Sequence, residues 1–410
     1  MSVTSPLSFD PSRICGMDDP VPALQELQDH DPIHWSPRYA TWLVTRYDDV
    51  RAGLADPRLS PRRVLPDPKN LDPAFARVFA DYRKYLDLWV VVRDPPDHTR
   101  LRGLTNKALT PSAIEALRPS VVTIVDNLLR RLPAQGEIDL VQGFAYPLPA
   151  EVIAELIGVP RSTLDDLKRW SDAIASSTAT AGDDLYSRAA TATVEMAAYL
   201  TGVVAERRNN PGHAIIDRLI AAHEGEDRLS HDELVANLIL FLFAGHETTT
   251  NLLCNGVRTL LRNPAQLADL RANLSDRDLV RNTVEEILRF DGALYLSLRV
   301  AVQDFSWHGR SVKAGDRVFL YHLAANRDHR AFADPDRFDI RRPDATRHIA
   351  FGYGIHFCLG APLARLEMEI ALPALLARYP RMTLADPGVA WKDNLVLRGP
   401  ARLHLDVGSE

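Results

Sequence analysis

A cysteine near the end of the chain stands in a stretch that suits a bulky flat ligand. Residues 351–360 read FGYGIHFCLG, so Gly352 and Gly354 precede Cys358 and Gly360 follows it. Glycines free the backbone and let a large planar group lie close to it. A helix is predicted to begin just after the cysteine, and its free N–H groups should favour a thiolate and lower the pKa of the thiol. A lone thiolate in such a loop suits the proximal side of a haem iron.

The alternative is that this cysteine is a buried packing residue, as free cysteines often are. The chain has three cysteines, and Cys15, Cys254 and Cys358 lie far apart in it. They can form neither a disulfide framework nor a CxxC metal pair. We expect Cys15 and Cys254 to pack in the core, whereas the glycines around Cys358 favour a ligand.

The segment from 231 to 262 is predicted to form the longest buried helix. Its sequence, HDELVANLILFLFAGHETTTNLLCNGVRTLLR, is largely apolar, and Ser230 with Glu233 can form a capping box at its start. Thirty-odd residues at a rise of ~1.5 Å give a helix of roughly 45–50 Å, which is enough to cross a domain.

A glycine, a carboxylate and a hydroxyl interrupt this apolar helix at Gly245, Glu247 and Thr248. A local rule broken at the centre of a well-packed element usually marks a functional site. The letters HE begin the zinc signature HExxH, but Thr250 stands where the second histidine would be, so this site is excluded. An acid beside an alcohol can relay protons into a dry pocket. Alternatively, the threonine hydroxyls bond back to helix carbonyls, and the residues alone leave both interpretations open.

Composition and charge argue against several classes of protein. The 410 residues are 46% hydrophobic and 25% charged, as in ordinary globular chains, and the formal net charge is −6 with no block of basic residues. The first residues lack the basic and apolar regions of a secretory signal. The longest apolar stretch, 238–245, is far shorter than the ~20 residues that span a bilayer. We therefore expect a soluble cytoplasmic protein that binds neither nucleic acid nor membrane.

The hydrophobic pattern predicts mostly helix with a minor β component. Residues 40–56 indicate a strand, a turn and a short helix, and residues 57–97, which carry many prolines, are predicted to be a long irregular lid or pocket wall. From 98 to 290 the spacing is mostly helical, 298–322 alternates like strands, and 361–379 should form a helix. There is no βαβ order, so we predict a mainly α (α+β) fold in one domain.

The cysteine stretch resembles the haem-binding loop of the cytochromes P450, F-G-x-G-x-H-x-C-x-G, and fills every fixed position of that motif. Four other stretches are similar to motifs of bacterial members, in the same order: DPPDHTRLR (94–102), AGHETT (244–249), EEILR (285–289) and ANRDHRAFADPDRFD (325–339). The resemblance covers the chain from about residue 20 to its end. It implies the cytochrome P450 fold, a helix-rich domain with a small β-rich subdomain.

The resemblance also implies a domain plan. Residues 1–20 would be a flexible N-terminus, and residues 21–410 would form a single cytochrome P450 domain. The β-rich part of that domain would lie mainly in residues 33–65, 298–322 and 385–408.

The resemblance assigns roles to individual residues. Cys358 would be the axial metal ligand, and Thr248 and Glu247 would be the catalytic residues that activate dioxygen, although many bacterial members have Asp in place of Glu247. The positions that match haem-propionate binders are His98, Arg102, Arg299 and His356. Further contacts with the haem would come from Phe351, Gly352, Ala244 and Gly245. The structural residues would be Glu286 and Arg289, an ion pair that holds the cysteine loop, together with Arg337.

The substrate pocket is predicted to have an apolar lining. Bacterial members often have two prolines after the E-x-x-R helix, but here 290–301 read FDGALYLSLRVA, so Leu294, Tyr295 and Leu296 should project into or beside the pocket. The full set of pocket residues is Trp89, Val90, Leu240, Phe243, Ala244, Leu294, Leu296 and Val396. Such a lining points to a lipophilic substrate, such as a terpenoid, steroid, polyketide or fatty-acid derivative of secondary metabolism.

The activity that the resemblance implies is that of a haem-thiolate monooxygenase, an oxidoreductase that holds haem b and uses O2 to hydroxylate or epoxidise its substrate. Electrons would come from a ferredoxin and its NAD(P)H reductase, because the chain has no flavin or iron–sulfur motif. Residues 341–347 and Arg365 flank the cysteine loop and are predicted to form a basic patch for an acidic ferredoxin. Two alternatives are a peroxide-driven haem peroxygenase and a non-catalytic haem carrier or sensor. The Glu247–Thr248 pair argues against both.

Overall fold

The molecule consists of a helical part and a smaller part built around a sheet. The computed structural model describes residues 9–62, 72–176, 183–212, 214–223, 229–386 and 388–408. The helices are α1 (Pro11–Cys15), α2 (Val21–His30), α3 (Tyr47–Ala55), α4 (Pro73–Asp87), α5 (Asp97–Ala108), α6 (Pro111–Glu115), α7 (Arg118–Arg131), α8 (Pro147–Ile157), α9 (Leu164–Ser176), α10 (Asp183–Asn209), α11 (Ile215–His223), α12 (His231–Arg262), α13 (Pro264–Ala272), α14 (Arg277–Asp291), α15 (His322–Ala325) and α16 (Ala361–Arg378). The mainly α prediction is confirmed.

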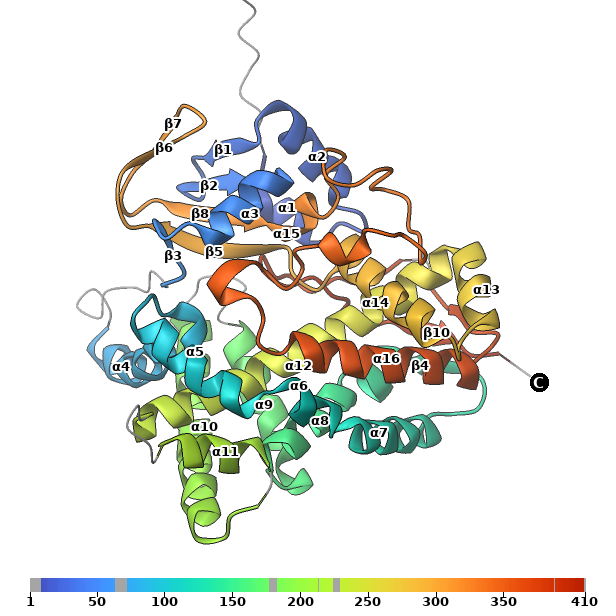
Figure 1. Cartoon of the computed structure of the whole chain (residues 1–410), viewed down its shortest axis with the longest axis horizontal. Coiled ribbons are helices and arrows are strands. Elements are labelled where there is room, and N and C mark those ends of the chain that lie inside the picture. The colour runs from blue at the N-terminus through green and yellow to red at the C-terminus, as the bar shows by residue number, and fades with distance from the viewer. Residues whose placement is uncertain are drawn as a thin grey trace, which may run out of the picture.

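The largest sheet joins segments from both ends of the chain. The strands are β1 (Ile33–Ser36), β2 (Thr41–Val44), β3 (Leu59–Ser60), β4 (Glu137–Asp139), β5 (Leu296–Ala301), β6 (Phe305–Trp307), β7 (Arg310–Val312), β8 (Arg317–Tyr321), β9 (Thr383–Leu384) and β10 (His404–Asp406). Five of them form one sheet in the order β1-β2-β8-β5-β3, with β2 parallel to β8. In Figure 1 this sheet lies with α1, α2 and α3 at one end of the molecule, and α12 runs through the helical part.

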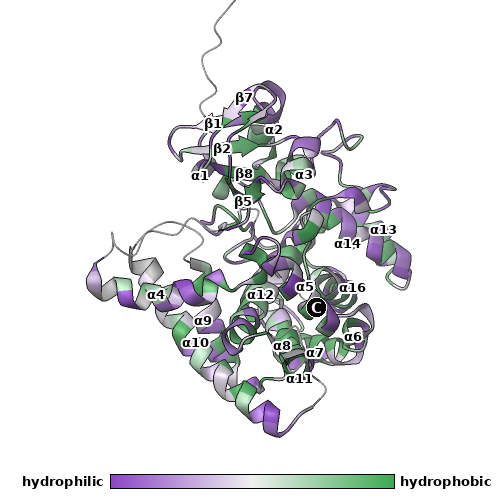
Figure 2. Ribbon diagram, turned by 60° about the vertical axis from the view of Figure 1, so that its left-hand side comes forward, coloured by the Kyte–Doolittle hydropathy of each residue, from purple (hydrophilic) through white to green (hydrophobic). Residues whose placement is uncertain are grey.

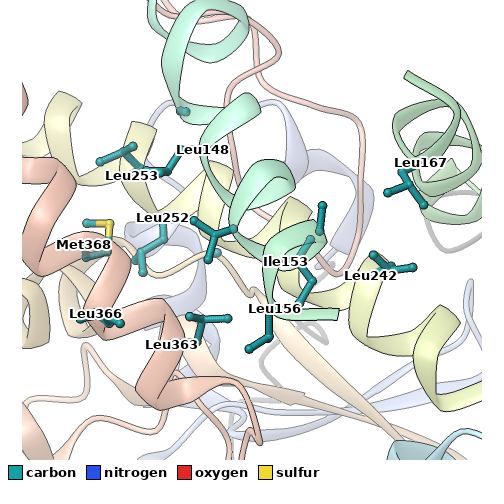
Figure 3. Close-up of a cluster of buried hydrophobic side chains, with 14 of the residues drawn as sticks. Leu148, Ile153, Leu156, Leu167, Leu242, Leu252, Leu253, Leu363, Leu366 and Met368 are labelled. Atoms are coloured by element: carbon teal, nitrogen blue, oxygen red, sulfur yellow. The ribbon is translucent and has the colours of Figure 1, made fainter. Parts of the chain in front are cut away.

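Helix α12 is the central element of the helical part. The predicted capping box is present, since Ser230 and Glu233 bond reciprocally, and the helix runs unbroken to Arg262 as predicted. Figure 2 shows hydrophobic residues along α12 and hydrophilic residues on peripheral helices such as α13. Side chains of α8, α12 and α16 meet in one buried core (Figure 3), and those shown include Leu148, Ile153, Leu156, Leu252, Leu253, Leu363, Leu366 and Met368. Among the described residues, no helix is both long and apolar enough to cross a membrane.

The N-terminal segment packs against the sheet. Ile14 of α1 is only 2% exposed, and its carbonyl accepts a hydrogen bond from the Tyr295 hydroxyl at 3.2 Å. The predicted flexible N-terminus therefore differs from the structure over residues 11–20, because Ile14 adds apolar surface to the core beneath the sheet. Residues 1–8 of that prediction lie outside the described residues.

The region predicted to be irregular, 57–97, contains the helix α4. Phe79, Tyr82 and Leu86 are at most 1% exposed and recur at helical spacing, so they give α4 a buried face. Pro73 is the first residue of α4, where proline is tolerated, and Pro95 and Pro96 follow the helix, so no proline interrupts its interior. Residues 63–71 of the predicted region lie outside the described residues.

A buried ion-pair network ties α14 to the segment that precedes the cysteine. Both Glu286 and Arg289 are 0% exposed, and two guanidinium nitrogens of Arg289 lie 2.7 and 2.8 Å from the Glu286 carboxylate oxygens. Arg289 also donates to the carbonyls of Asn326 and Pro335, at 3.0 and 2.9 Å. The network thus holds two points of the 325–339 segment to one helix.

The arginine that completes this network is Arg342, and the prediction of Arg337 is wrong. Arg342 is 6% exposed, and its Nε donates to Glu286 at 3.2 Å. The Arg337 side chain instead pairs with Asp339 at the surface, and only its carbonyl takes part, accepting from Arg342 at 3.0 Å. Arg337 and Arg342 stand close together in the sequence, so the path of the chain decides which side chain turns inward.

Replacing Arg342 by Met should destabilise the protein far more than replacing Arg337 by Met. Removing one partner of a buried ion pair leaves an uncompensated charge and costs about 3–5 kcal/mol, whereas an exposed pair is worth about 0–1 kcal/mol. The free energies of unfolding of the two variants in urea measure this difference. Equal losses for Arg342→Met and Arg337→Met would contradict the assignment.

Candidate active site

The cysteine loop, residues 351–360, takes its shape from two glycines. Gly352 and Gly354 have φ of +77° and +73°, a conformation that side chains disfavour. The loop closes when the Cys358 N–H donates to the Phe351 carbonyl at 2.9 Å. Helix α16 then begins at Ala361, so the thiol stands at the start of this helix as predicted.

The environment of the thiol differs from the prediction in one respect. Burial raises the pKa of the Cys358 thiol, although the N–H groups of Gly360 and Ala361 and the Arg102 charge lower it. The helix N–H groups thus act in the predicted direction, and burial, which the sequence prediction did not weigh, acts against them. Cys15 and Cys254 lie buried in the core, as expected.

Four basic side chains gather beside the cysteine loop. His98 and Arg102 come from α5, Arg299 from β5 and His356 from the loop itself. The imidazole rings of His98 and His356 lie 4.3 Å apart. Burial and then the charges of His98, Arg299 and Arg102 lower the pKa of His356 to about 3. The four predicted propionate binders are thus brought together by three separate elements.

This cluster contains hydrogen-bond donors that lack acceptors. In the described part of the chain, His98 Nε2 and His356 Nδ1 are buried and have no hydrogen-bond partner. Burial lowers the pKa of Arg299 to about 10, and among nearby carboxylates Asp94 opposes the shift. Buried donors and cations need anionic or polar partners. The two carboxylates of a haem would satisfy that need, and Cys358 would supply a sulfur ligand, so these residues fit a haem.

In the middle of α12, a row of residues retains accessible surface although most of the helix is buried. We call Phe241, Ala244, Gly245 and Thr248 the accessible stripe, since their spacing places them on one face. This face is apolar apart from the Thr248 hydroxyl. Figure 1 shows the beginning of α16, which follows the cysteine loop, close to α12, and the two helices are in contact.

The space beside Gly245 is bounded by α8, because a Cβ at this position would lie 3.3 Å from Ile153 Cδ1. The predicted contact of Gly245 with a haem stays a prediction.

The hydroxyls of two threonines in α12 bond back to helix carbonyls. Thr248 Oγ1 donates to Ala244 at 2.9 Å, and Thr250 Oγ1 donates to His246 at 3.0 Å. This is the alternative that the sequence left open, and the helix stays continuous through it. The two positions differ in one way, because Thr248 belongs to the accessible stripe whereas Thr250 is 1% exposed.

The carboxylate of Glu247 has a partner that sequence reasoning missed. Its Oε1 lies 2.5 Å from Nζ of Lys392, which stands after α16 near the C-terminus. The two residues are 145 positions apart. No local sequence pattern could have indicated this pair.

Some of the predicted pocket residues lie on α12 or against the C-terminal segment, and others pack in the core beneath the sheet. Trp89 stacks on Phe243 at a ring distance of 5.7 Å, and the Val90 N–H bonds to Asn237 of α12 at 3.0 Å, so the 89–90 segment lies on α12, and its role in the pocket stays a prediction. Leu240 belongs to the same buried core. Leu294 forms a bridge with Leu397 of the C-terminal segment.

Tyr295 and Leu296 differ from the prediction. Each is 1% exposed and packs in the apolar cluster between the sheet and α2, where Leu24 and Phe319 also lie. The structure therefore assigns both side chains to this core rather than to the pocket, because alternation along β5 turns Leu296 to the face opposite Arg299. Val396 packs against the same cluster, and its pocket role stays a prediction.

The predicted basic patch beside the cysteine loop is wrong for two of its arginines. Arg342 is buried in the Glu286 network. Arg365 pairs with Glu285 at 2.5 and 2.9 Å. Burial raises the pKa of Glu285, but hydrogen bonds from Arg365 and His348 lower it to about 2. Both guanidinium groups therefore form ion pairs within the chain rather than a docking surface for a ferredoxin.

Comparisons with known proteins agree with the motifs. The family model described as "Cytochrome P450" matches residues 68–394. "Cytochrome P450 107B1" of Saccharopolyspora erythraea is 41% identical over 374 residues, which cover 90% of this chain and 89% of that protein. "Vitamin D(3) 25-hydroxylase" of Pseudonocardia autotrophica is 38% identical, with 95% and 94% covered. The solved structure of the "Bacillaene Polyketide Synthase (PKS) Cytochrome P450 PksS" of Bacillus subtilis 168 has a TM-score of 0.86 at 35% identity, with 98% and 100% covered.

Replacing Arg299 by Leu should reduce the haem content of the purified protein, whereas replacing Arg317 by Leu should not. Both arginines lie in the large sheet, but Arg317 is exposed and does not belong to the cluster of His98, Arg102, Arg299 and His356. A hydrogen bond to a charged group is worth about 1.5–3 kcal/mol, so haem affinity should fall roughly tenfold or more. Haem absorbance per protein after desalting measures it. Full haem content in Arg299→Leu would contradict the role of the cluster.

Proposed function

This chain belongs to the cytochrome P450 family and is an oxidoreductase of the monooxygenase type, and we propose that it hydroxylates or epoxidises a lipophilic small molecule. The observation that carries the proposal is the accessible stripe of α12, which presents an apolar face with a single hydroxyl, at Thr248. A substrate bound against such a face must be mainly apolar. Two relatives, a vitamin D3 hydroxylase and a polyketide synthase cytochrome, support by their names a steroid-like or polyketide substrate.

The cofactor that we propose is haem b, held between the cysteine loop and the accessible stripe. Cys358 would ligate the iron, and the cluster of His98, Arg102, Arg299 and His356 would bind the propionates. The three cysteines stand too far apart for the C-x-x-C-H motif that attaches haem covalently, which supports a non-covalent haem. When bound, this group supplies the activation of dioxygen.

The chain's own residues would control protons and water around that chemistry. Thr248 would donate its hydroxyl proton into the site, and Glu247, which is 8% exposed, would replace it with a proton from solvent. Trp89 and Phe243, stacked on each other, would keep bulk water from the stripe. Proton delivery and water exclusion would thus be separate tasks of α12 and the 89–90 segment.

For electron supply we propose a ferredoxin with its NAD(P)H reductase. With two of the predicted arginines used internally, the cysteine loop itself is the better docking candidate. Its Tyr353, Ile355 and Phe357 are 36, 53 and 40% exposed, and the Arg51 guanidinium lies 4.5 Å from the Tyr353 ring. An apolar patch with one cation suits a weak, transient partner. A ferredoxin KM that Arg51→Glu leaves unchanged would argue against this face.

Replacing Thr248 by Ala should uncouple electron consumption from product formation, whereas Thr250→Ala should not. Both changes remove the same kind of bond to a helix carbonyl, but only Thr248 lies on the accessible stripe. Positioned proton donors contribute roughly 10²–10⁴-fold to rates, so product per NAD(P)H should fall by at least about half. The assay uses vitamin D3 as probe substrate with ferredoxin, the reductase and NAD(P)H, and measures product and hydrogen peroxide. Equal coupling in the two variants would contradict the role of Thr248.

A further inference from the structure

The segment after α16 folds back along one side of α12. We call residues 391–400 the C-terminal hairpin, since a bridge between Trp391 and Pro400 closes it. Its hydrogen bonds with α12 involve Glu247, Asn251 and Asn255, which recur at intervals of four residues and therefore lie on one face of the helix. We call these three residues the polar stripe.

The two ends of the hairpin are both attached to the polar stripe. Lys392 Nζ donates to Glu247 Oε1 at 2.5 Å and to Asn251 Oδ1 at 3.1 Å. At the other end, Asn255 Nδ2 donates to the Arg398 carbonyl at 3.1 Å. A Cβ at Gly399 would clash with the Asn251 side chain, so only a glycine allows this close approach. The ammonium group is thus fixed in position along α12.

The other neighbours of Glu247 do not offer a positive charge at hydrogen-bond distance. On the side of α8 and α9, burial and then the Glu247 charge raise the pKa of Asp172, and the Tyr146 hydroxyl donates to Asp172 at 3.3 Å. In the described part of the chain, Lys392 is the cation that contacts the Glu247 carboxylate directly. Removing it would leave a buried carboxylate facing another carboxyl group.

We propose that Lys392 is a positioning residue for Glu247, holding its carboxylate in one orientation beside Thr248 on α12. The inference rests on the proposed monooxygenase function. Consecutive residues of a helix project about 100° apart, so Thr248 faces the accessible stripe while Glu247 faces the hairpin. The Lys392 side chain is 25% exposed and the Glu247 side chain 11%, so solvent reaches the ion pair. Glu247 takes a proton from solvent water and passes it to the Thr248 oxygen, which gives its own proton to the site.

The lysine acts as an anchor and not as the acid in this sequence. Lys392 Nζ donates hydrogen bonds to both Glu247 and Asn251, so it acts on the position of the carboxylate, and the proton that Glu247 passes on comes from solvent water. The charge of Lys392 and its length are therefore what matter. Arginine at this position keeps the charge, and methionine keeps most of the length without it.

Three variants of the haem-loaded enzyme test the proposal: Lys392→Met, Lys392→Arg and Asn255→Ala. With vitamin D3 as probe substrate, Lys392→Met should lower product per NAD(P)H several-fold, with an unchanged KM and a larger solvent isotope effect. Lys392→Arg should restore most of the coupling. Asn255→Ala removes the hydrogen bonds from α12 to the Arg398 and Asp291 carbonyls without touching Glu247, so it should lower the melting temperature and keep the coupling. A coupling loss as large in Asn255→Ala as in Lys392→Met would overturn the proposal, since it would show a purely structural role.

A second measurement needs no substrate and no turnover. Melting temperatures of Lys392→Met, Glu247→Gln and the double variant form a cycle in which the pair should show non-additive shifts. Additive shifts would overturn the inference. A wild-type protein that oxidises no lipophile would instead contradict the proposed function, and the melting cycle would still decide whether Lys392 holds Glu247.

Discussion

Burying two guanidinium groups around one carboxylate fixes the path of the chain that leads to the cysteine loop. Glu286 accepts from Arg289 and Arg342, and both arginines use their remaining donors on backbone carbonyls of the 326–337 segment. One of these carbonyls belongs to Asn326, whose side-chain oxygen accepts from the Ile349 N–H at 2.8 Å just before the loop. Such networks are weak evidence of net stability, but they specify one arrangement, because any other leaves buried charges unpaired.

The same principle of satisfied polarity organises helix α12. The helix crosses an apolar core, yet it carries chemistry on two of its sides. The accessible stripe ends at Thr248, while the polar stripe is covered by the C-terminal hairpin. An uncovered carboxylate at Glu247 would be costly in this core. Lys392 removes that cost, and it sets where the carboxylate stands relative to the hydroxyl.

Local sequence signals predicted the parts of the structure that local physics decides. The capping box and long apolar run of α12, and the positive φ angles at Gly352 and Gly354, follow from neighbours in the sequence. The cluster of His98, Arg102, Arg299 and His356 could be predicted only through the family resemblance, since these residues come from three separate elements.

The features that the sequence did not predict depend either on contacts between residues far apart in the chain or on opposed effects on a pKa. No sequence pattern near Arg337 indicates that Arg342 is the arginine that turns inward, and none near Glu247 indicates that Lys392 is its partner. The segment of α4 was hidden by prolines on either side of it. The pKa of Cys358 depends on whether burial or the helix N–H groups dominate, which the sequence does not set.

The central claim is that Cys358 is the thiolate ligand of a haem iron. The most direct test is the absorption spectrum of the reduced protein with carbon monoxide, for the wild type and for Cys358→Ser. The account predicts a strongly red-shifted Soret band in the wild type that is lost in the variant. A protein without haem, or a band that is unshifted and indifferent to the substitution, would contradict it.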